Sequence, residues 1–540
     1  MNKTHKAKAI DLYSGIGGWT LGMKMSSVEN VESFEWWSEA NLTHNLNFGT
    51  DHEEVDIRKL SLESLPEPGT INFVLGSPPC TQFSYANRGG NGDIADGLKD
   101  IHKFLEVVNY LKPKYWAMEN VPRVSNILKR ELGIGGQLYK FRQLFTVNTI
   151  VNSADYGVPQ SRKRMIAGNF PFELFNAYKV AIPTRTLQEV LDALTKDIII
   201  DPIFGIELSA GEVTDNYHED SLSPEEERIN REAKTYHPVY NKMSFPDQVT
   251  RPSRTVTATC TRVSRESIIV KDERNPKKYR RLNIRERALV QSFPITYQLH
   301  GKSFSSRFKM IGNAIPPLLA YYVLQSMLET PVKELKAPSE VAYKHKPASV
   351  ADPVKMDTAG SKYPAKRNFK FAVPHLRFGS GVRFDLSNSF QEGKVEWRIA
   401  FYYGNSKKIK SLSLNEEVLS ATLEYLDFST REAIQKELQQ LDWLFDDFDS
   451  AILQKVWCKK EKGLHPFEII DQLGKVAKKL VDRFFPEPSV ELSELAHVIL
   501  HEEINQKLAR YSNLIIVGFI VGSWGNLLIA KKQPVNELTI

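Results

Sequence analysis

Two patterns of apolar residues alternate along the first third of the chain. Short apolar stretches, as expected for buried strands, occur at residues 8–14, 31–38, 71–77 and 115–121. Apolar residues recur every three or four positions, as in amphipathic helices, at residues 18–25 and 101–114. Strands that alternate with helices form parallel sheets with helical crossovers, so the pattern predicts an α/β fold. Such sheets bind ligands at the carboxyl ends of their strands.

The alternating pattern stops near residue 170. Prolines, charge clusters and short irregular runs dominate residues 170–280, which indicates an inserted lobe. A helical pattern returns at 283–293, and residues 315–329 are expected to form an apolar helix with proline near its first turn. We therefore expect a first domain over 1–169, a lobe over 170–280 and a return to the first domain over 281–330.

A change of composition separates the last third of the chain from the rest. Residues 331–367 are rich in Pro, Lys, Ala and Ser, which is typical of a linker. Residues 368–540 open with alternating strands at 382–387 and 395–404 and continue with helical segments, so they predict a separate α+β domain. We find no internal repeats.

Residues 514–530 are the one segment that could be considered a transmembrane helix. The stretch is apolar and nearly long enough to span a bilayer. Its middle, Gly-Ser-Trp-Gly-Asn at 522–526, resembles a turn between two short apolar runs. The sequence therefore favours a buried hairpin or a pair of core strands over a membrane helix.

Composition indicates a soluble protein of two or three domains, since 41% of the 540 residues are hydrophobic and 25% are charged. The basic, polar start of the chain lacks the apolar segment of a secretory signal, so we expect a cytoplasmic protein. Three cysteines, Cys80, Cys260 and Cys458, are too few and too scattered for a disulfide framework or a thiolate zinc site. We expect free thiols and no metal.

The formal net charge of +6 is unevenly distributed. From Arg251 to Arg287 the chain carries twelve Lys or Arg against four Asp or Glu. Such a local excess is usually a solvated face, but it is also typical of a surface that contacts phosphates.

A glycine-rich turn follows the first expected strand and opens the first expected helix. The sequence Asp-Leu-Tyr-Ser-Gly-Ile-Gly-Gly at 11–18 would let backbone N–H groups approach a ligand closely. Glu39, assigned to the end of the next strand, is placed to bind ribose hydroxyls, and Asp56 follows a third candidate strand, where it could accept from an adenine amino group. Together these features favour a cofactor that contains adenosine.

Cys80 follows another apolar strand and two prolines. A cysteine in this position is by default a small buried hydrophobe. Glu119 ends a neighbouring strand, however, and Arg162 and Arg164 follow a turn further along the chain. A thiol, a carboxyl group and two guanidinium groups near one cofactor would form a catalytic set, in which the cationic groups favour the thiolate.

The order of these motifs resembles the motif series of the DNA (cytosine-5) methyltransferase family. The matching segments are residues 11–18, 76–84, 118–121, 160–164, 280–294 and 311–317, so the resemblance covers about residues 7 to 330. It implies a Rossmann-like methyltransferase sheet with a target-recognition lobe over 170–280. It also implies S-adenosylmethionine as the methyl donor and double-stranded DNA as the substrate.

The resemblance implies a role for each catalytic residue. Cys80 would add to C6 of a flipped-out cytosine, and Glu119 would contact N3 and the exocyclic amine. Arg164 would hydrogen-bond O2 of the base, and Arg162 would help to hold the catalytic loop. The cofactor residues that the resemblance and the glycine turn imply are Asp11, Tyr13, Gly15, Gly17, Gly18, Glu39, Asp56, Asn313 and Ala314. Tyr13 replaces the phenylalanine that usually stacks on adenine, and Trp19 is a further candidate for this pocket.

Contacts to DNA are expected on both sides of the catalytic motifs. Candidate contacts are Ser84, Asn120, Arg251, Arg254, Arg262 and Arg265, and base edges are expected to be read within about 185–250. The chain departs from the family in having Thr81 before Gln82, where glutamine usually follows the nucleophile directly. The glycine-rich loop over 84–97 would suit closure over a flipped base.

Several alternatives stay open. A branch of the family methylates transfer RNA, but its typical Cys-Phe-Thr tripeptide is absent here. A catalytically dead DNA-binding relative would not need the full motif set.

The C-terminal domain could make the chain a bifunctional restriction-modification protein. The nearest match to a nuclease core there is Asp385 with Glu396 and Arg398, although an ordinary strand pair is the simpler interpretation. An accessory domain is the favoured assignment, and a cognate restriction endonuclease is a possible partner.

Overall fold

A computed structural model describes residues 6–83, 92–235, 243–358, 360, 363–379, 382–405, 408–503 and 505–531. The chain divides into two compact units. The first contains residues 1–230 and 244–358, and the second contains residues 231–243 and 359–540. The second unit therefore includes a short segment from within the lobe expected over 170–280.

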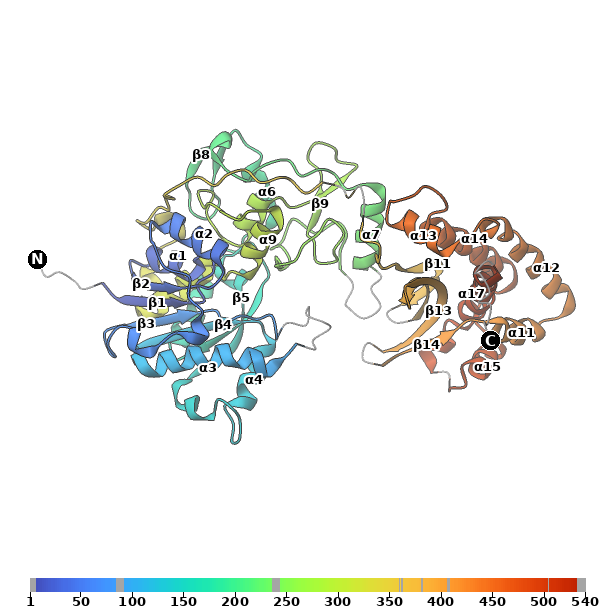
Figure 1. Cartoon of the computed structure of the whole chain (residues 1–540), viewed down its shortest axis with the longest axis horizontal. Coiled ribbons are helices and arrows are strands. Elements are labelled where there is room, and N and C mark those ends of the chain that lie inside the picture. The colour runs from blue at the N-terminus through green and yellow to red at the C-terminus, as the bar shows by residue number, and fades with distance from the viewer. Residues whose placement is uncertain are drawn as a thin grey trace, which may run out of the picture. The chain divides into compact units, whose positions relative to one another are not determined.

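A six-stranded sheet forms the centre of the first unit (Figure 1). Its strands are β1 (Lys8–Leu12), β2 (Glu29–Phe34), β3 (Phe73–Gly76), β4 (Tyr115–Asn120), β5 (Val147–Asn152) and β6 (Lys163–Gly168), in the order β2-β1-β3-β4-β6-β5. Strands β1 to β4 run parallel, while β6 is antiparallel to both of its neighbours. The expected α/β sheet is confirmed.

Helices cover both faces of this sheet. Helices α1 (Gly18–Met25) and α10 (Pro317–Met327) contribute to one apolar core, and α3 (Ile94–Leu111) and α4 (Arg123–Glu131) contribute to the other. Figure 1 shows α3 and α4 along one side of the sheet, with α1 and α2 (Ser38–Phe48) on the other. Neighbouring residues of β3, such as Val74 and Leu75, belong to different cores because successive side chains point to opposite faces.

The late part of the unit packs directly onto its first turn. A Cβ atom at Gly18 would lie 2.3 Å from the carbonyl oxygen of Ile315, and one at Gly22 would lie 2.8 Å from Cβ of Ala320. Glycine at these two positions therefore lets α1 approach α10 closely. This contact brings the early and late motifs together.

The remaining elements of the first unit are short and belong mostly to the lobe. They are α5 (Phe172–Ala177), α6 (Leu187–Leu194), β7 (Ile198–Ile200), β8 (Glu207–Ser209), α7 (Pro224–Thr235, of which residues 231–235 fall in the second unit), β9 (Ile269–Lys271), β10 (Tyr279–Arg281), α8 (Ile284–Val290) and α9 (Phe304–Asn313).

Residues 331–358 do not form the first part of a linker. Within the first unit, the His345 ring stacks on Tyr297 with ring centroids 5.0 Å apart, and the N–H of Ala348 donates to the carbonyl of Leu46 at 2.7 Å. The carboxylate of Asp357 pairs with Arg281 at 2.8 Å. The sequence suggested a linker because proline and lysine dominate the composition, but buried side chains spaced among them anchor the segment.

The second unit contains a four-stranded antiparallel sheet in the order β11-β12-β13-β14. The strands are β11 (Lys370–Gly379), β12 (Val382–Gln391), β13 (Lys394–Asn405) and β14 (Lys408–Ser413). The helices are α11 (Glu416–Glu424), α12 (Phe428–Gln439), α13 (Ser450–Trp457), α14 (Pro466–Phe484), α15 (Val490–Leu500), α16 (Gln506–Ala509) and α17 (Ser512–Lys531). An α+β domain was expected and is observed.

The hairpin or strand pair expected over 514–530 is wrong, because α17 runs through this segment as one helix. A Cβ atom at Gly518 would lie 2.2 Å from the Phe384 ring, and one at Gly525 would lie 2.7 Å from Ile399. The glycines thus form a packing face against the sheet rather than a turn. The helix is long and apolar enough to cross a membrane, but 72% of its most apolar window is buried inside the protein.

The suggested nuclease residues do not converge. Asp385 on β12 is opposite Ala400, whereas Glu396 is opposite Ser389, four residues further along the strand. At about 3.3 Å per residue, this offset is about 13 Å, too far for two carboxylates to share one metal. Asp385 is buried and pairs with Arg383 at 2.5 Å. The simpler assignment, an ordinary strand pair, describes these residues.

Candidate active site

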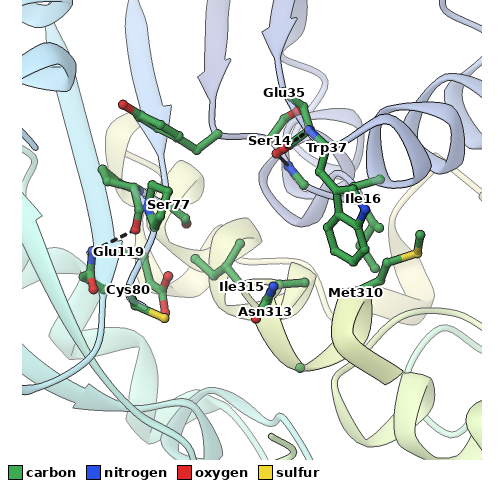
Figure 2. A pocket seen from close by; sticks show the side chains of 18 of the residues that line it. Ser14, Ile16, Glu35, Trp37, Ser77, Cys80, Glu119, Met310, Asn313 and Ile315 are labelled. Atoms are coloured by element: carbon green, nitrogen blue, oxygen red, sulfur yellow. Dashed lines mark hydrogen bonds between the residues drawn. The ribbon is translucent and has the colours of Figure 1, made fainter. Parts of the chain in front are cut away.

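A cavity of about 370 Å³ lies at the carboxyl ends of β1, β3 and β4. Figure 2 shows Cys80 and Glu119 on one side, Ser14 and Glu35 on the other, and Asn313 and Ile315 between them. The predicted residues that line it are Tyr13, Gly15, Trp19, Cys80, Glu119, Asn120, Arg162, Arg164, Asn313 and Ala314. The structure thus gathers segments from distant parts of the first unit.

The turn that carries Cys80 is held by hydrogen bonds from two neighbouring elements. The side-chain amide of Asn120 donates to the carbonyl of Pro78 at 2.9 Å, and the indole of Trp19 donates to the hydroxyl of Ser77 at 3.0 Å. Asn120 is only 2% exposed. Its side chain fixes the turn, and its contact with DNA stays a prediction.

The thiol of Cys80 faces an environment with opposing effects. Burial raises its pKa, and the Glu119 carboxylate raises it further, while Arg164 and Arg162 lower it. The net pKa is above the ordinary value. The two arginines favour the thiolate, as expected, but the desolvation cost outweighs their attraction.

Glu119 and Arg164 form an ion pair at the edge of the cavity. Nε of Arg164 lies 2.9 Å from Oε1 of Glu119. Both side chains are largely buried, and they come from adjacent antiparallel strands, β4 and β6. The pair presents a carboxylate and a guanidinium next to the thiol, which is the donor and acceptor set that a pyrimidine edge requires.

The buried side chain of Arg162 connects separate segments of the first unit by hydrogen bonds. Its guanidinium donates to the carbonyls of Val256 at 2.9 Å, Gly312 at 2.9 Å and Ala314 at 3.2 Å, and the residue is 1% exposed. Burial, together with the charge of Arg164, lowers the pKa of Arg162 to about 9. The side chain joins the start of β6 to two late segments of the site, and its expected role in holding the catalytic loop stays a prediction.

The acidic residue beside the glycine turn is Glu35, not Glu39. Strand β2 ends at Phe34, so Glu35 follows it directly, while Glu39 lies in the first turn of α2 and does not line the cavity. The Glu35 carboxylate accepts from the backbone N–H groups of Gly15 at 2.8 Å and Trp37 at 2.8 Å. The expectation that Glu39 ends the strand is wrong because β2 ends at Phe34, four residues before the expected strand end at residue 38.

Three other expected cofactor residues lie behind the turn rather than at the cavity. Asp11 is fully buried and accepts from the Thr20 hydroxyl at 2.9 Å, and burial raises its pKa to about 8. Gly17 precedes α1 in a left-handed conformation, and Gly18 packs on Ile315. These residues shape the turn and do not line the cavity.

A second cavity, of about 630 Å³, shares Tyr13, Trp36, Pro79 and Thr81 with the first. Asp56 lines it, and its contact with adenine stays a prediction. The other lining residues are Glu54, Val55, Ile57, Arg58, Gln82, Asp96 and Asp100. The two cavities therefore form adjoining parts of one site.

Sequence reasoning missed several residues of the site. Ser14 is buried, and its hydroxyl has no hydrogen-bond partner among the described residues. The indole of Trp36 is 63% exposed beside both cavities, and Lys309 lies over the Trp37 ring at 4.6 Å. The available signal was the Glu-Trp-Trp run directly after the second strand, which the expected strand boundary obscured.

The arginines expected to contact DNA have different environments. Arg251 is exposed, whereas Arg254 pairs with Asp247 and Arg265 pairs with Glu266. Arg262 has a 4% exposed side chain, with Nε 2.8 Å from Glu226 and Nη1 3.3 Å from Glu219. A phosphate contact by Arg262 is therefore wrong in this conformation.

Ser84 and the loop residues 84–91 lie outside the described residues. Gln82, which the family would place directly after the cysteine, accepts from the backbone N–H of Asp93 at 3.0 Å. It therefore fastens the turn to the start of α3.

One group of metal-ligating side chains converges within the described ranges. His218 Nδ1 lies 3.0 Å from Glu273, and its Nε2 lies 3.7 Å from Asp272. Both ring nitrogens thus face carboxylates. None of the three residues lines the 370 Å³ cavity.

Comparison with known proteins agrees with the site. Residues 7–329 match the family model of C-5 cytosine-specific DNA methylases. The chain is 27% identical over 353 residues to the type II methyltransferase M.FnuDI of Fusobacterium nucleatum, a match that covers 62% of this chain and 98% of that protein. It is 28% identical over 346 residues to M.NgoPII of Neisseria gonorrhoeae, with coverages of 60% and 96%. Among solved structures, methyltransferase EhMeth of Entamoeba histolytica has a TM-score of 0.42 and 17% identity, covering 60% and 99%.

Proposed function

The chain belongs to the C-5 cytosine-specific DNA methylase family, and from this premise we propose that it methylates C5 of a flipped-out cytosine through a covalent Cys80 adduct. The observation that carries the proposal is the convergence of Cys80, Glu119 and Arg164 in one cavity that adjoins the glycine turn. A nucleophile, an acid and a cation from three different strand ends have no evident structural reason to meet there.

The residues of the adjoining cavities fit S-adenosylmethionine. The unpartnered hydroxyl of Ser14 can donate to a ligand, and the Glu35 carboxylate lies beside the Gly15 backbone, where ribose hydroxyls would reach it. The exposed indole of Trp36 and the ring of Tyr13 offer aromatic surfaces for adenine. When bound here, S-adenosylmethionine would supply the methyl group for C5, and S-adenosylhomocysteine would be the leaving group.

Cys80 supplies the nucleophile. C5 of cytosine is a weak nucleophile, so the ring must first gain electron density. Addition of the Cys80 thiolate to C6 forms a C–S bond and moves the C5–C6 electron pair toward C5. Burial raises the pKa of the thiol, so formation of the thiolate requires that its proton pass to a base when cytosine enters.

Glu119 and Arg164 hold the base during this addition. Glu119 contacts N3 and the exocyclic amine and stabilises the protonated ring nitrogen, and Arg164 donates to O2. Their mutual ion pair keeps both groups oriented toward the same edge. After C5 has been alkylated, loss of the C5 proton restores the C5–C6 double bond and expels the thiolate.

The target cytosine must leave the duplex before this chemistry. C6 of a stacked cytosine is not accessible to a thiol in a protein cavity, so extrusion of the base is required. We infer that the substrate is double-stranded DNA in the cytoplasm and that the lobe over 170–280 recognises the target sequence. A cognate restriction endonuclease is a candidate partner, and the second unit is assigned as an accessory domain.

A duplex that carries 5-fluorocytosine at the target tests the covalent mechanism. Fluorine cannot leave as a proton does, so the parent protein with S-adenosylmethionine should form a denaturation-resistant complex. Cys80→Ser should abolish the complex. Cys260→Ser serves as the matched control, since Cys260 does not line the cavity, and it should trap DNA like the parent. Undiminished trapping by Cys80→Ser would remove Cys80 from the nucleophile role.

A further inference from the structure

Three side chains of the second cavity form a connected network. The hydroxyl of Tyr13 lies 3.1 Å from the carbonyl oxygen of Asp100 and 3.3 Å from its Oδ1. Burial, with a contribution from Asp100, raises the pKa of Tyr13, so the phenol keeps its proton and donates. A phenylalanine, which the family usually has at this position, could not make this contact.

Arg58 completes the network from the opposite wall. Its Nε and Nη2 donate to the two carboxylate oxygens of Asp100 at 2.9 and 2.7 Å, which is a bidentate pair. Its Nη1 donates to Oδ1 of Asp96 at 2.9 Å, and Nη2 also reaches the Asp96 carbonyl at 3.0 Å. Arg58 comes from the 3-10 helix at Ile57–Lys59, directly after Asp56, so the wall that carries Asp56 is tied to α3.

The backbone of Tyr13 needs support. Its φ angle is 58°, in the left-handed region that non-glycine residues rarely adopt. The hydrogen bonds from the hydroxyl hold the far end of the ring while β1 and the glycine turn hold the near end. The network therefore fixes the ring as one wall shared by both cavities.

The same helix also packs on the turn that carries the nucleophile. A Cβ atom at Gly97 of α3 would lie 2.6 Å from the Phe83 ring, and the N–H of Phe83 donates to the carbonyl of Cys80 at 3.0 Å. Helix α3 thus connects the Cys80 turn with the Asp96 and Asp100 carboxylates.

We propose that the Tyr13–Asp100–Arg58 network of this chain is a positioning device for the adenosyl end of the cofactor. This inference rests on the proposed methyltransferase function. The three residues hold the Tyr13 ring at a fixed distance from the segment that carries Asp56. Arg58 acts through Asp100 and does not contact the reacting atoms.

Tyr13→Phe and Arg58→Gln test the proposal in the full-length protein. Both variants should bind S-adenosylmethionine at least about 3-fold more weakly by calorimetry, because Tyr13→Phe loses the hydroxyl that donates to Asp100 and Arg58→Gln loses the bidentate pair. The loss should appear in KM for S-adenosylmethionine rather than in kcat. Tyr115→Phe is the matched control, because it removes a hydroxyl that donates to Glu329 at 2.7 Å and does not line either cavity.

The outcomes separate the inference from the proposed function. Unchanged affinity in both variants, or a fall in kcat at constant KM, would overturn the network's role while the parent still methylates cytosine. A parent that neither binds S-adenosylmethionine nor methylates DNA would overturn the proposed function and this inference together. Because Tyr13→Phe could disturb the turn, thermal unfolding of each variant is measured. Arg58 is partly exposed, so Arg58→Gln gives a second, independent measurement of cofactor affinity. Weaker binding at an unchanged melting temperature supports the proposal.

Discussion

Nε of Arg164 lies 2.9 Å from Oε1 of Glu119, so the two side chains assigned to the cytosine edge already hold each other in place. The pair comes from antiparallel strands whose register sets Glu119 opposite Ile166, which fixes the spacing through the backbone. Preorganisation of this kind reduces the cost of orienting catalytic groups when a base arrives.

Glu119→Gln should lower the rate of methyl transfer by about 10²- to 10⁴-fold, the usual contribution of a positioned acid or base. Glutamine keeps the shape but cannot stabilise a protonated N3 to the same degree. Single-turnover methylation with a radiolabelled donor measures the effect. Glu106→Gln, on α3 and outside the cavity, is the control and should match the parent. A Glu119→Gln rate within threefold of the parent would contradict the assigned role.

Alkylation of Cys80 by iodoacetamide should rise with pH and reach half its maximum above the pH typical of a free thiol. The sign follows from the raised pKa, because the reactive thiolate appears only above that pKa. Arg164→Gln should move the midpoint higher, since this arginine lowers the pKa, and Glu119→Gln should move it lower. Peptide mass spectrometry reports Cys80 separately, with Cys260 as an internal comparison. A midpoint below that of free cysteine would refute the assigned environment.

Arg262→Met should destabilise the protein by about 3–5 kcal/mol, because it leaves the buried Glu226 carboxylate without its charged partner, while Glu219 keeps its pair with Arg281. Arg251→Gln should change stability by no more than about 0.5 kcal/mol. If Arg251 contacts a phosphate, the plot of the logarithm of the DNA-binding constant against the logarithm of salt concentration should be less steep by about 0.9 in its variant. Urea unfolding and salt titrations distinguish the two arginines. Full stability of Arg262→Met would contradict the buried ion pairs.

His345→Phe should reduce the acid sensitivity of the first unit. Burial lowers the pKa of His345 to about 3, below the ordinary value of 6.5, so the unfolded chain takes up a proton that the folded chain does not. The stability that this neutral ring contributes is complete above about pH 6.5 and is lost as the pH falls toward 3. The free energy of unfolding should therefore fall less steeply with decreasing pH in the variant than in the parent. Between pH 4 and 6 we expect a difference in slope of up to about 1.4 kcal/mol per pH unit.

Lys346→Ala, an exposed neighbour, is the control and should keep the parent's slope. Unfolding midpoints measured at several pH values give the comparison. An unchanged slope in His345→Phe would mean that residue 345 titrates normally and that the segment 331–358 is not anchored by this ring.

Much of the site followed from the sequence because local patterns determine it. The strands before Cys80 and Glu119 are short buried runs, and the parallel sheet brings their carboxyl ends to one edge. The motif order then assigned the chemistry without knowledge of any distance. Long-range packing was not needed for these assignments.

Tertiary structure decided what local patterns leave open. Glu35 rather than Glu39 faces the glycine turn because strand pairing with β1 ends at Phe34. The glycines near residue 520 read as a turn, yet they form a helix face because the sheet of the second unit packs against them. Arg262 looks like a DNA contact in the sequence, but carboxylates that are 36 and 43 positions distant surround it. Each of these outcomes depends on partners remote in the chain, and burial of charge or apolar surface against those partners outweighs the local preference.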